Sequence, residues 1–275
     1  MTKKMPILLT FDIDGETLWR SKGPEFAKLP VVLSQGRFGP EVGIPRILKA
    51  LKKNDVKATF FIPGFTAQQY PDMVKTIDAA GHEIGNHGWF HTHPEHIEKY
   101  EDEEKEYVDA QNYLCELTGK TPKGFRAPAW EFSDYTIDII EKLGFEYSSN
   151  MMDSESVEPL QFPDRKTNLV ELPVNSILDD TTYWLFSLKT STTMQPLDGG
   201  ESNMKREFDA LLSFFLEEME EKGDSNICFL LTCHPQVTGH ASRIRMLEGL
   251  IEYIKSHDQV QFMTCSEAVA WFKAK

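Results

Sequence analysis

The sequence contains few cysteines, and no two of them are spaced as metal ligands. The four cysteines, Cys115, Cys228, Cys233 and Cys265, are scattered along 275 residues. Without the two-residue spacing of a structural zinc site or the density of a disulfide scaffold, free thiols are expected. Cys233 precedes His234, but neighbouring residues in a strand point to opposite faces, which disfavours a catalytic Cys–His pair.

Long apolar runs and basic charge are also lacking. The first apolar run, residues 7–9, is too short for the core of a signal peptide. No stretch approaches the roughly 20 apolar residues that a membrane-spanning helix needs. Lysine and arginine total 29 against 43 aspartates and glutamates, a formal net charge of −14 that repels phosphate backbones. We therefore expect a soluble, cytoplasmic protein with neither a nucleic-acid nor a membrane partner.

Strand-like apolar runs alternate with amphipathic helical patterns along most of the chain. Strands are expected at residues 7–12, 57–62, 82–86, 124–127, 145–148, 170–174, 226–233 and 260–264. This alternation predicts an α/β fold with a parallel sheet. About seven or eight strands in a chain of this length favour a distorted, closed or nearly closed (β/α) barrel. Thr264 and Glu267 form a capping-box pattern before the last expected helix.

The chain shows no internal repeat, low-complexity tract or linker. We therefore expect one domain over residues 1–275, with rim insertions at about 15–43 and 150–200. The insertion at 15–43 is rich in glycine, proline and charge, which predicts a long loop of the kind that often acts as a lid. The insertion at 150–200 has an irregular pattern apart from one short strand.

Histidines cluster in one part of the sequence, since five of the eight lie within residues 80–96. His87 and His91 are four residues apart, so a helix or a glycine-containing turn can direct both rings to one side. Asp12 and Asp14 follow a buried strand and, in extended chain, share one side, where a cation relieves their repulsion. Two imidazoles and a carboxylate suit a divalent metal, so Asp14, His87 and His91 are candidate ligands.

Each of these signals also has a plainer interpretation. The histidine segment can be a solvated loop, and the two aspartates can be turn and capping residues. We interpret His93 and His96 as solvated loop residues, His82 as a packing residue at the start of a strand, and His240 and His257 as surface residues.

The candidate groups all fall at the carboxyl ends of expected strands. They are the pair Asp12 and Asp14, the pair His87 and His91, residues 126–130, and His234. In (β/α) barrels the catalytic residues gather at this end of the sheet. This coincidence favours a metal-dependent hydrolase over the plainer interpretations.

Five motifs of this sequence match one known family. They are Thr-Phe-Asp-Ile-Asp-Gly at 10–15, Ala-Thr-Phe-Phe at 58–61, Gly-His-Glu-Ile-Gly-Asn-His at 81–87 with another histidine at 91, Arg-Ala-Pro-Ala-Trp at 126–130, and the late His234. Over nearly its whole length the chain resembles the polysaccharide deacetylase family, also called the NodB-homology or carbohydrate esterase family four. The resemblance implies a metal-dependent hydrolase of amide bonds that removes acetyl groups from N-acetylated sugars.

The resemblance also implies a role for each matching residue. The metal ligands would be Asp14, His87 and His91. The general base, the residue that orients it, the oxyanion-stabilising backbone N–H and the general acid would be Asp12, Arg126, Trp130 and His234, respectively. In the family an aspartate holds this late histidine, and here Asp179 and Asp180 both remain candidates. Zinc is the usual ion for such ligands, and cobalt, nickel or iron also fit.

Three features depart from the common family pattern. Ile13 separates the two aspartates, Gly88 replaces a serine or threonine, and the sequence shows no export signal. Together with residues 38–45, these features resemble a cytoplasmic branch that includes peptidoglycan-deacetylase-like proteins and is similar to allantoinases and cyclic-imide hydrolases. An alternative substrate is therefore a small cyclic amide or imide, and a further alternative is a non-catalytic binding protein that retains the fold. Whether the protein is a homo-oligomer stays open.

Overall fold

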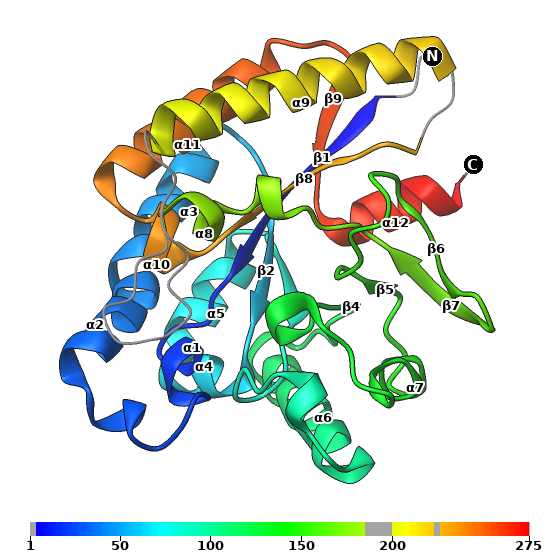
Figure 1. Cartoon of the computed structure of the whole chain (residues 1–275). Helices are drawn as coiled ribbons and strands as arrows, with labels where there is room; N and C mark the ends of the chain where they lie inside the picture. The colour runs from blue at the N-terminus through cyan, green and yellow to red at the C-terminus, as the bar shows by residue number, and fades with distance from the viewer. Residues whose placement is uncertain (1–3, 185–199, 223–225, 275) are drawn as a thin grey trace.

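A nine-stranded sheet forms the centre of the computed structural model, which describes residues 4–184, 200–222 and 226–274 (Figure 1). The strands are β1 (Met5–Asp12), β2 (Thr59–Ile62), β3 (Glu83–Asn86), β4 (Gly124–Phe125), β5 (Tyr147–Ser148), β6 (Glu158–Phe162), β7 (Arg165–Glu171), β8 (Phe229–Cys233) and β9 (Val260–Met263). Their order is β6-β7-β5-β4-β3-β2-β1-β8, with β9 also paired to β1. Every pair is parallel except β6 with β7.

Helices surround this curled sheet, as Figure 1 shows. The α-helices are α1 (Thr17–Arg20), α2 (Pro30–Phe38), α3 (Ile44–Lys53), α4 (Gly64–Gln69), α5 (Pro71–Ala79), α6 (Tyr100–Thr118), α7 (Thr136–Lys142), α8 (Asp180–Trp184), α9 (Gly200–Lys222), α10 (Pro235–Thr238), α11 (Ala241–Lys255) and α12 (Cys265–Lys273). Single turns of other helix types are η1 (Phe26–Lys28), η2 (Gly39–Gly43), η3 (Pro94–His96), η4 (Pro128–Trp130) and η5 (Ser176–Leu178). The expected α/β barrel-like fold is confirmed, although the sheet is a half-barrel in which β6 and β8 do not pair.

Strand β1 lies at the centre of the sheet because it is apolar on both faces. All eight of its residues are buried, as expected for a strand covered by helices on one side and enclosed by the sheet on the other. Leu9 and Phe11 belong to the largest hydrophobic cluster, and Leu8 belongs to another one. The alternation continues beyond the strand. Ile13 is in the largest cluster, so Asp12 and Asp14 share the opposite side.

The first rim insertion, residues 15–43, is helical rather than the long loop that its composition predicts. It contains α1, η1, α2 and η2. Its glycines serve close packing: a Cβ at Gly36 would lie 2.4 Å from the backbone oxygen of Gly15, and one at Gly43 would lie 2.3 Å from that of Pro235. In this insertion the glycines permit close contact between backbones rather than a loop. The prediction of a long loop at 15–43 was wrong.

Other differences concern the bounds of elements. The expected strand at 170–174 is β7, which begins and ends earlier. Helix α7 begins at Thr136, and the Ser133 hydroxyl before it accepts a bond from the N–H of Tyr135. The rim insertion at 150–200 contains β6, β7, η5 and α8, and its residues 185–199 lie outside the described part of the chain.

Some expectations agree closely with the structure, and two are not tested by it. Thr264 and Glu267 form the expected capping box at the start of α12. Within the described ranges, no helix is both long enough and apolar enough to cross a membrane. The single domain and the cytoplasmic location stay predictions.

Gly43→Ala should destabilise the protein, because its Cβ would meet the backbone oxygen of Pro235 and displace α10. Overpacking of this kind costs about 1–3 kcal/mol, to be measured as a lower free energy of unfolding in urea. Gly249→Ala in α11 is the matched control, since a Cβ there meets nothing within 4 Å. An alanine in an open helical position stabilises by about 0.5–1 kcal/mol. Equal effects of the two substitutions would contradict the packing argument.

Candidate active site

The structure brings the sequence-predicted polar residues together at one edge of the sheet. Asp12 ends β1, His87 follows β3, Arg126 follows β4, and His234 follows β8. Because these strands run parallel, their carboxyl ends meet at the same rim of the half-barrel. The convergence that the sequence predicts is therefore present in the fold.

Asp14, His87 and His91 form a compact buried group. The Nε2 atoms of His87 and His91 lie 3.5 and 3.6 Å from Asp14 Oδ1. That oxygen is buried and has no hydrogen-bond partner. Unpaired polar atoms are costly inside a protein, so three donor atoms that face one another around an orphaned carboxylate oxygen fit a divalent cation.

A turn, not a helix, directs both histidines toward Asp14. After β3 the chain reverses at Gly88, whose φ of 69° is favourable for glycine, and His91 itself has a φ of 56°. Glu106 of α6 holds the loop by accepting bonds from the N–H groups of Trp89 and Phe90 at 3.0 and 2.9 Å. A residue other than glycine in the left-handed backbone conformation costs about 1–3 kcal/mol of conformational energy, and such residues are typical of functional sites.

The protonation states of this group suit metal binding. Burial alone would raise the pKa of Asp14, but His91, His87 and His234 together hold it below its usual range. Burial lowers the pKa of His91 to about 4. The Nδ1 atom of His87 lies 2.7 Å from the carbonyl oxygen of Arg126, which requires a proton on Nδ1 and leaves the Nε2 lone pair toward Asp14. At neutral pH the group therefore offers an ionised Asp14 and a neutral His91, the states in which these side chains bind metals, and the Nε2 atom of His87 faces Asp14.

Asp12 is paired with a fully buried arginine. Arg126 Nη1 lies 2.7 Å from Asp12 Oδ1 and also donates to the Thr10 hydroxyl at 3.0 Å. The other guanidinium nitrogens donate to Ser149, and the guanidinium lies 4.2 Å from the centre of the Phe61 ring. The arginine thus fixes the orientation of the Asp12 carboxylate from several sides.

His234 is held by Asp180 rather than by Asp179. Its Nδ1 is 2.8 Å from Asp180 Oδ1 and 3.9 Å from Asp179 Oδ1. Asp180 Oδ2 accepts bonds from the backbone N–H of His234 and from the Thr238 hydroxyl, at 2.9 and 2.6 Å. Asp179 instead accepts from the N–H of Thr181 at 2.6 Å.

The electrostatic surroundings keep His234 protonated. Burial alone would lower its pKa, but Asp179 and Asp180 together raise that pKa well above its usual value. The pKa of Asp179 is raised as well, in this case by burial, to about 6. His234 Nε2 lies 4.0 Å from Asp14 Oδ2, so its free N–H faces the buried group. This imidazole is placed and charged as a proton donor.

Trp130, the residue expected to stabilise the oxyanion, lies in a tight turn after β4. Its backbone N–H already donates to the carbonyl oxygen of Ala127 at 3.0 Å, within a turn where Ala129 and Trp130 have φ values of 58° and 60°. Its side chain is half-buried against a hydrophobic cluster that includes Leu8. The oxyanion role of Trp130 stays a prediction, and it requires this turn hydrogen bond to be shared or released.

Two site residues have no signal in the sequence. Gln236 Nε2 donates to Asp14 Oδ2 at 3.2 Å. Glu171 accepts from the N–H groups of Asn150 and Met151 at 2.6 and 2.9 Å, and Asn150 Oδ1 accepts from the N–H of Ala127 at 2.7 Å. Through this chain of bonds Glu171 supports the segment that begins with Arg126. Neither residue belongs to a motif, and in the sequence Glu171 is an ordinary member of a strand.

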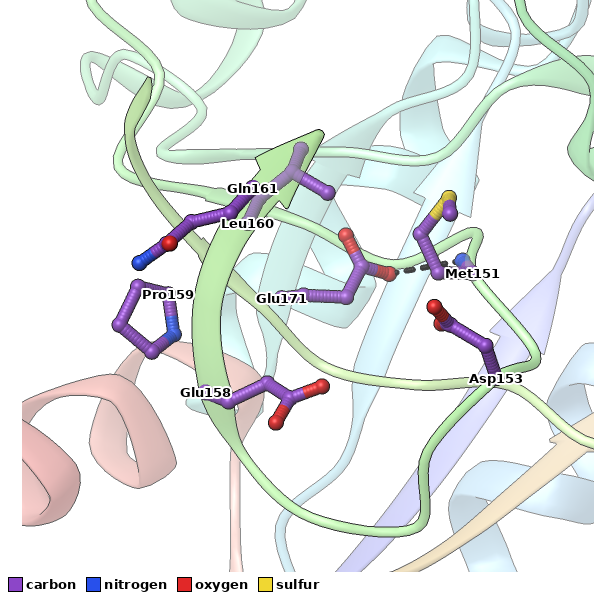
Figure 2. Close-up of a pocket in the computed structure, with 7 residues that line it drawn as sticks. All are labelled: Met151, Asp153, Glu158, Pro159, Leu160, Gln161 and Glu171. Atoms are coloured by element: carbon purple, nitrogen blue, oxygen red, sulfur yellow. Dashed lines mark hydrogen bonds between the residues drawn. The ribbon is translucent and has the colours of Figure 1, made fainter. Parts of the chain in front are cut away.

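A cavity of about 260 Å³ is lined by residues of β6 and β7 and of the chain that follows β5. Figure 2 shows Glu171 beside it. Its dashed line marks the bond to Met151, and the carboxylates of Asp153 and Glu158 border the same space. Burial raises the pKa of Glu171. Because one oxygen of Glu171 accepts hydrogen bonds from backbone N–H groups, this carboxyl group has a structural role at the edge of the site.

Another cavity, of about 390 Å³, adjoins the buried group. Gln236, which contacts Asp14, lines it, and so do the aromatic residues Trp19, Phe38 and Trp184. These aromatic residues come from both rim insertions. The two insertions therefore enclose space next to the candidate site.

The remaining histidines and Cys233 lie mostly as expected. Cys233 is buried in the largest hydrophobic cluster, and burial raises its pKa well above the usual value, so it is no nucleophile. His82 is buried and its Nδ1 accepts a bond from the N–H of Ala58. His240 is exposed but stacks on Phe38 at 4.2 Å.

Comparisons with known proteins agree with this geometry. The model of the polysaccharide deacetylase family matches residues 30–148. A peptidoglycan deacetylase of Helicobacter pylori is 32% identical over an alignment that covers 97% of this chain and 96% of that protein.

Solved structures give the same result. A crystal structure from Mycobacterium smegmatis, assigned to the polysaccharide deacetylases, matches with a TM-score of 0.87 and 31% identity, over 100% of this chain and 92% of that one. A crystal structure of an allantoinase matches with a TM-score of 0.80 over 100% of this chain and 92% of that one, but its 22% identity shows a shared fold only. The chain belongs to the polysaccharide deacetylase family and is a hydrolase of carbon–nitrogen bonds other than peptide bonds.

Proposed function

We propose that the protein is a divalent-metal-dependent deacetylase that removes acetyl groups from N-acetylated sugars, peptidoglycan included. The observation that supports this most is the orphaned Asp14 oxygen between the His87 and His91 nitrogens. A base-like carboxylate, Asp12, and an acid-like imidazole, His234, flank this group. The named activity of the Helicobacter pylori relative indicates the substrate class.

Asp14, His87 and His91 would hold the ion, with zinc as the first choice and cobalt, nickel and iron as alternatives. When bound, such an ion lowers the pKa of water and polarises the carbonyl of the amide. The ligands themselves are fixed by their surroundings, since the Arg126 carbonyl orients His87 and Gln236 orients Asp14.

The reaction adds water to the acetyl carbonyl and breaks the carbon–nitrogen bond. Asp12 accepts the proton of the attacking water at Oδ2, while Arg126 holds Oδ1. His234 then donates the proton on Nε2 to the leaving nitrogen, while Asp180 keeps its Nδ1 proton in place. The products are acetate and the free amine of the sugar.

A small cyclic amide or imide is an alternative candidate substrate. The cavity of about 390 Å³ next to Gln236 favours it, because both rim insertions line this cavity. Assays of purified enzyme on chitin oligomers and on succinimide-like rings separate the two. Release of acetate from the oligomers alone supports the deacetylase, and opening of the rings alone supports the alternative.

Asp12→Asn and Asp14→Asn should have different defects. Asp12→Asn removes the base but no ligand, so kcat should fall about 10²–10⁴-fold with the metal content unchanged. Asp14→Asn removes a charged ligand, so bound metal should be lost together with activity. Acetate release and elemental analysis measure the two effects. The assignment fails if Asp12→Asn loses its metal while Asp14→Asn keeps it.

The alkaline limb of the pH profile should report His234. The protonated form is the active one, and its pKa is raised, so activity persists above pH 6.5, the usual value, and falls only as pH rises through the raised pKa. Asp180→Asn removes a charge that raises this pKa, and the alkaline limb of kcat/KM should therefore move to lower pH. Asp153→Asn, an exposed aspartate, is the control. An alkaline limb that stays in place in Asp180→Asn would refute the assignment.

A further inference from the structure

Four imidazoles form a row from the surface to the buried group. The ring centres of His87 and His91 are 5.1 Å apart, those of His91 and His93 are 6.0 Å apart, and those of His93 and His96 are 5.6 Å apart. Exposure rises along the row: His87 and His91 are buried, His93 is partly exposed and His96 is exposed. The proposed reaction uses only the inner two.

The outer two histidines are arranged by a single helical turn. In η3 the N–H of His96 donates to the carbonyl of His93 at 3.0 Å, and that of Ile97 donates to Pro94 at 2.9 Å. Side chains three residues apart eclipse in this type of turn. The rings of His93 and His96 therefore stack at an angle of 10°, and buried Pro94 anchors the turn below them.

Glu95 completes a set of metal donors at the surface. Its Oε1 lies 3.3 Å from Nδ1 of His93. One donor atom from each of His93, Glu95 and His96 lies within 4.8 Å of the other two. Two imidazoles and a carboxylate are the same kinds of ligand as in the buried group, and their exposure leaves room for water to complete the coordination.

We propose that His93, Glu95 and His96 form another, exposed site for a divalent transition metal, which captures the ion for the buried group. The net charge of −14 concentrates cations near the protein, and the row of imidazoles connects the two sites. Binding at the outer site stands on its own geometry, whereas the capture role rests on the proposed catalytic metal centre.

Equilibrium dialysis of untagged, metal-stripped protein against Zn²⁺ tests the binding. The natural protein should bind two ions, one of them weakly. The double variant His93→Ala, His96→Ala should lose the weak ion, and Asp14→Ala should lose the tight one. His257→Ala, a histidine outside the cluster, should bind as the natural protein does.

These variants separate the two proposals. If the double variant still binds two ions, or the natural protein binds only one, the outer site is wrong. If Asp14→Ala keeps the tight ion, the proposed catalytic centre is wrong, whatever the outer site does.

The rate of loading tests the capture role. Co²⁺ bound by histidine and carboxylate absorbs visible light, so its entry into stripped protein can be followed by stopped flow. At a Co²⁺ concentration too low to keep the weak outer site filled, the double variant should fill the buried group about tenfold more slowly, because the local ion concentration falls. Its final absorbance should equal that of the natural protein, since only the buried group stays occupied. Equal rates for the two proteins would overturn the capture role.

Discussion

The buried guanidinium of Arg126 is the constraint on which the rest of the site depends. It is fully buried and pairs with Asp12 while also binding Thr10 and Ser149. Its backbone carbonyl meanwhile holds Nδ1 of His87. Arg126, which directly follows β4, thus fixes both Asp12 on β1 and His87 after β3, the proposed base and a proposed metal ligand. Removing one partner of such a buried pair lowers the stability of a protein by about 3–5 kcal/mol. Arg126 and Asp12 therefore depend on each other for the stability of the fold as well as for the geometry of the site.

Near this pair, the surroundings shift the pKa values of ionisable side chains in opposite directions. Neighbouring imidazoles keep the Asp14 carboxylate ionised despite burial, and burial lowers the pKa of His91. His234 is only partly exposed, and two aspartates keep it protonated. Environments that separate pKa values in this way assign different tasks to groups of the same type. One imidazole can therefore bind a cation while another, near the same carboxylate, carries a proton.

The sequence was sufficient for the fold class and for the residues that converge on the site. Both depend on local signals: buried apolar runs fix the strands, and Asp12, His87, Arg126 and His234 each lie at or directly after the end of a strand. Gln236 and Glu171 could not be found in this way, because their importance comes from contacts between distant elements. The helical rim at 15–43 was missed for a related reason. Glycines that permit close backbone contact cannot be told in sequence from glycines that permit turns.

The incomplete barrel itself explains how His234, the proposed proton donor, is held. Strands β6 and β8 do not pair, and the segment after β7 lies against β8. An isolated bridge joins Asp179 to Thr232 on β8 and brings the next residue, Asp180, to His234. A continuous strand at this place would alternate its side chains, whereas η5 and the start of α8 direct two adjacent carboxylates toward one imidazole. The segment after β7 therefore brings to β8 the two carboxylates that keep His234 protonated. This is why the choice between Asp179 and Asp180 required the structure.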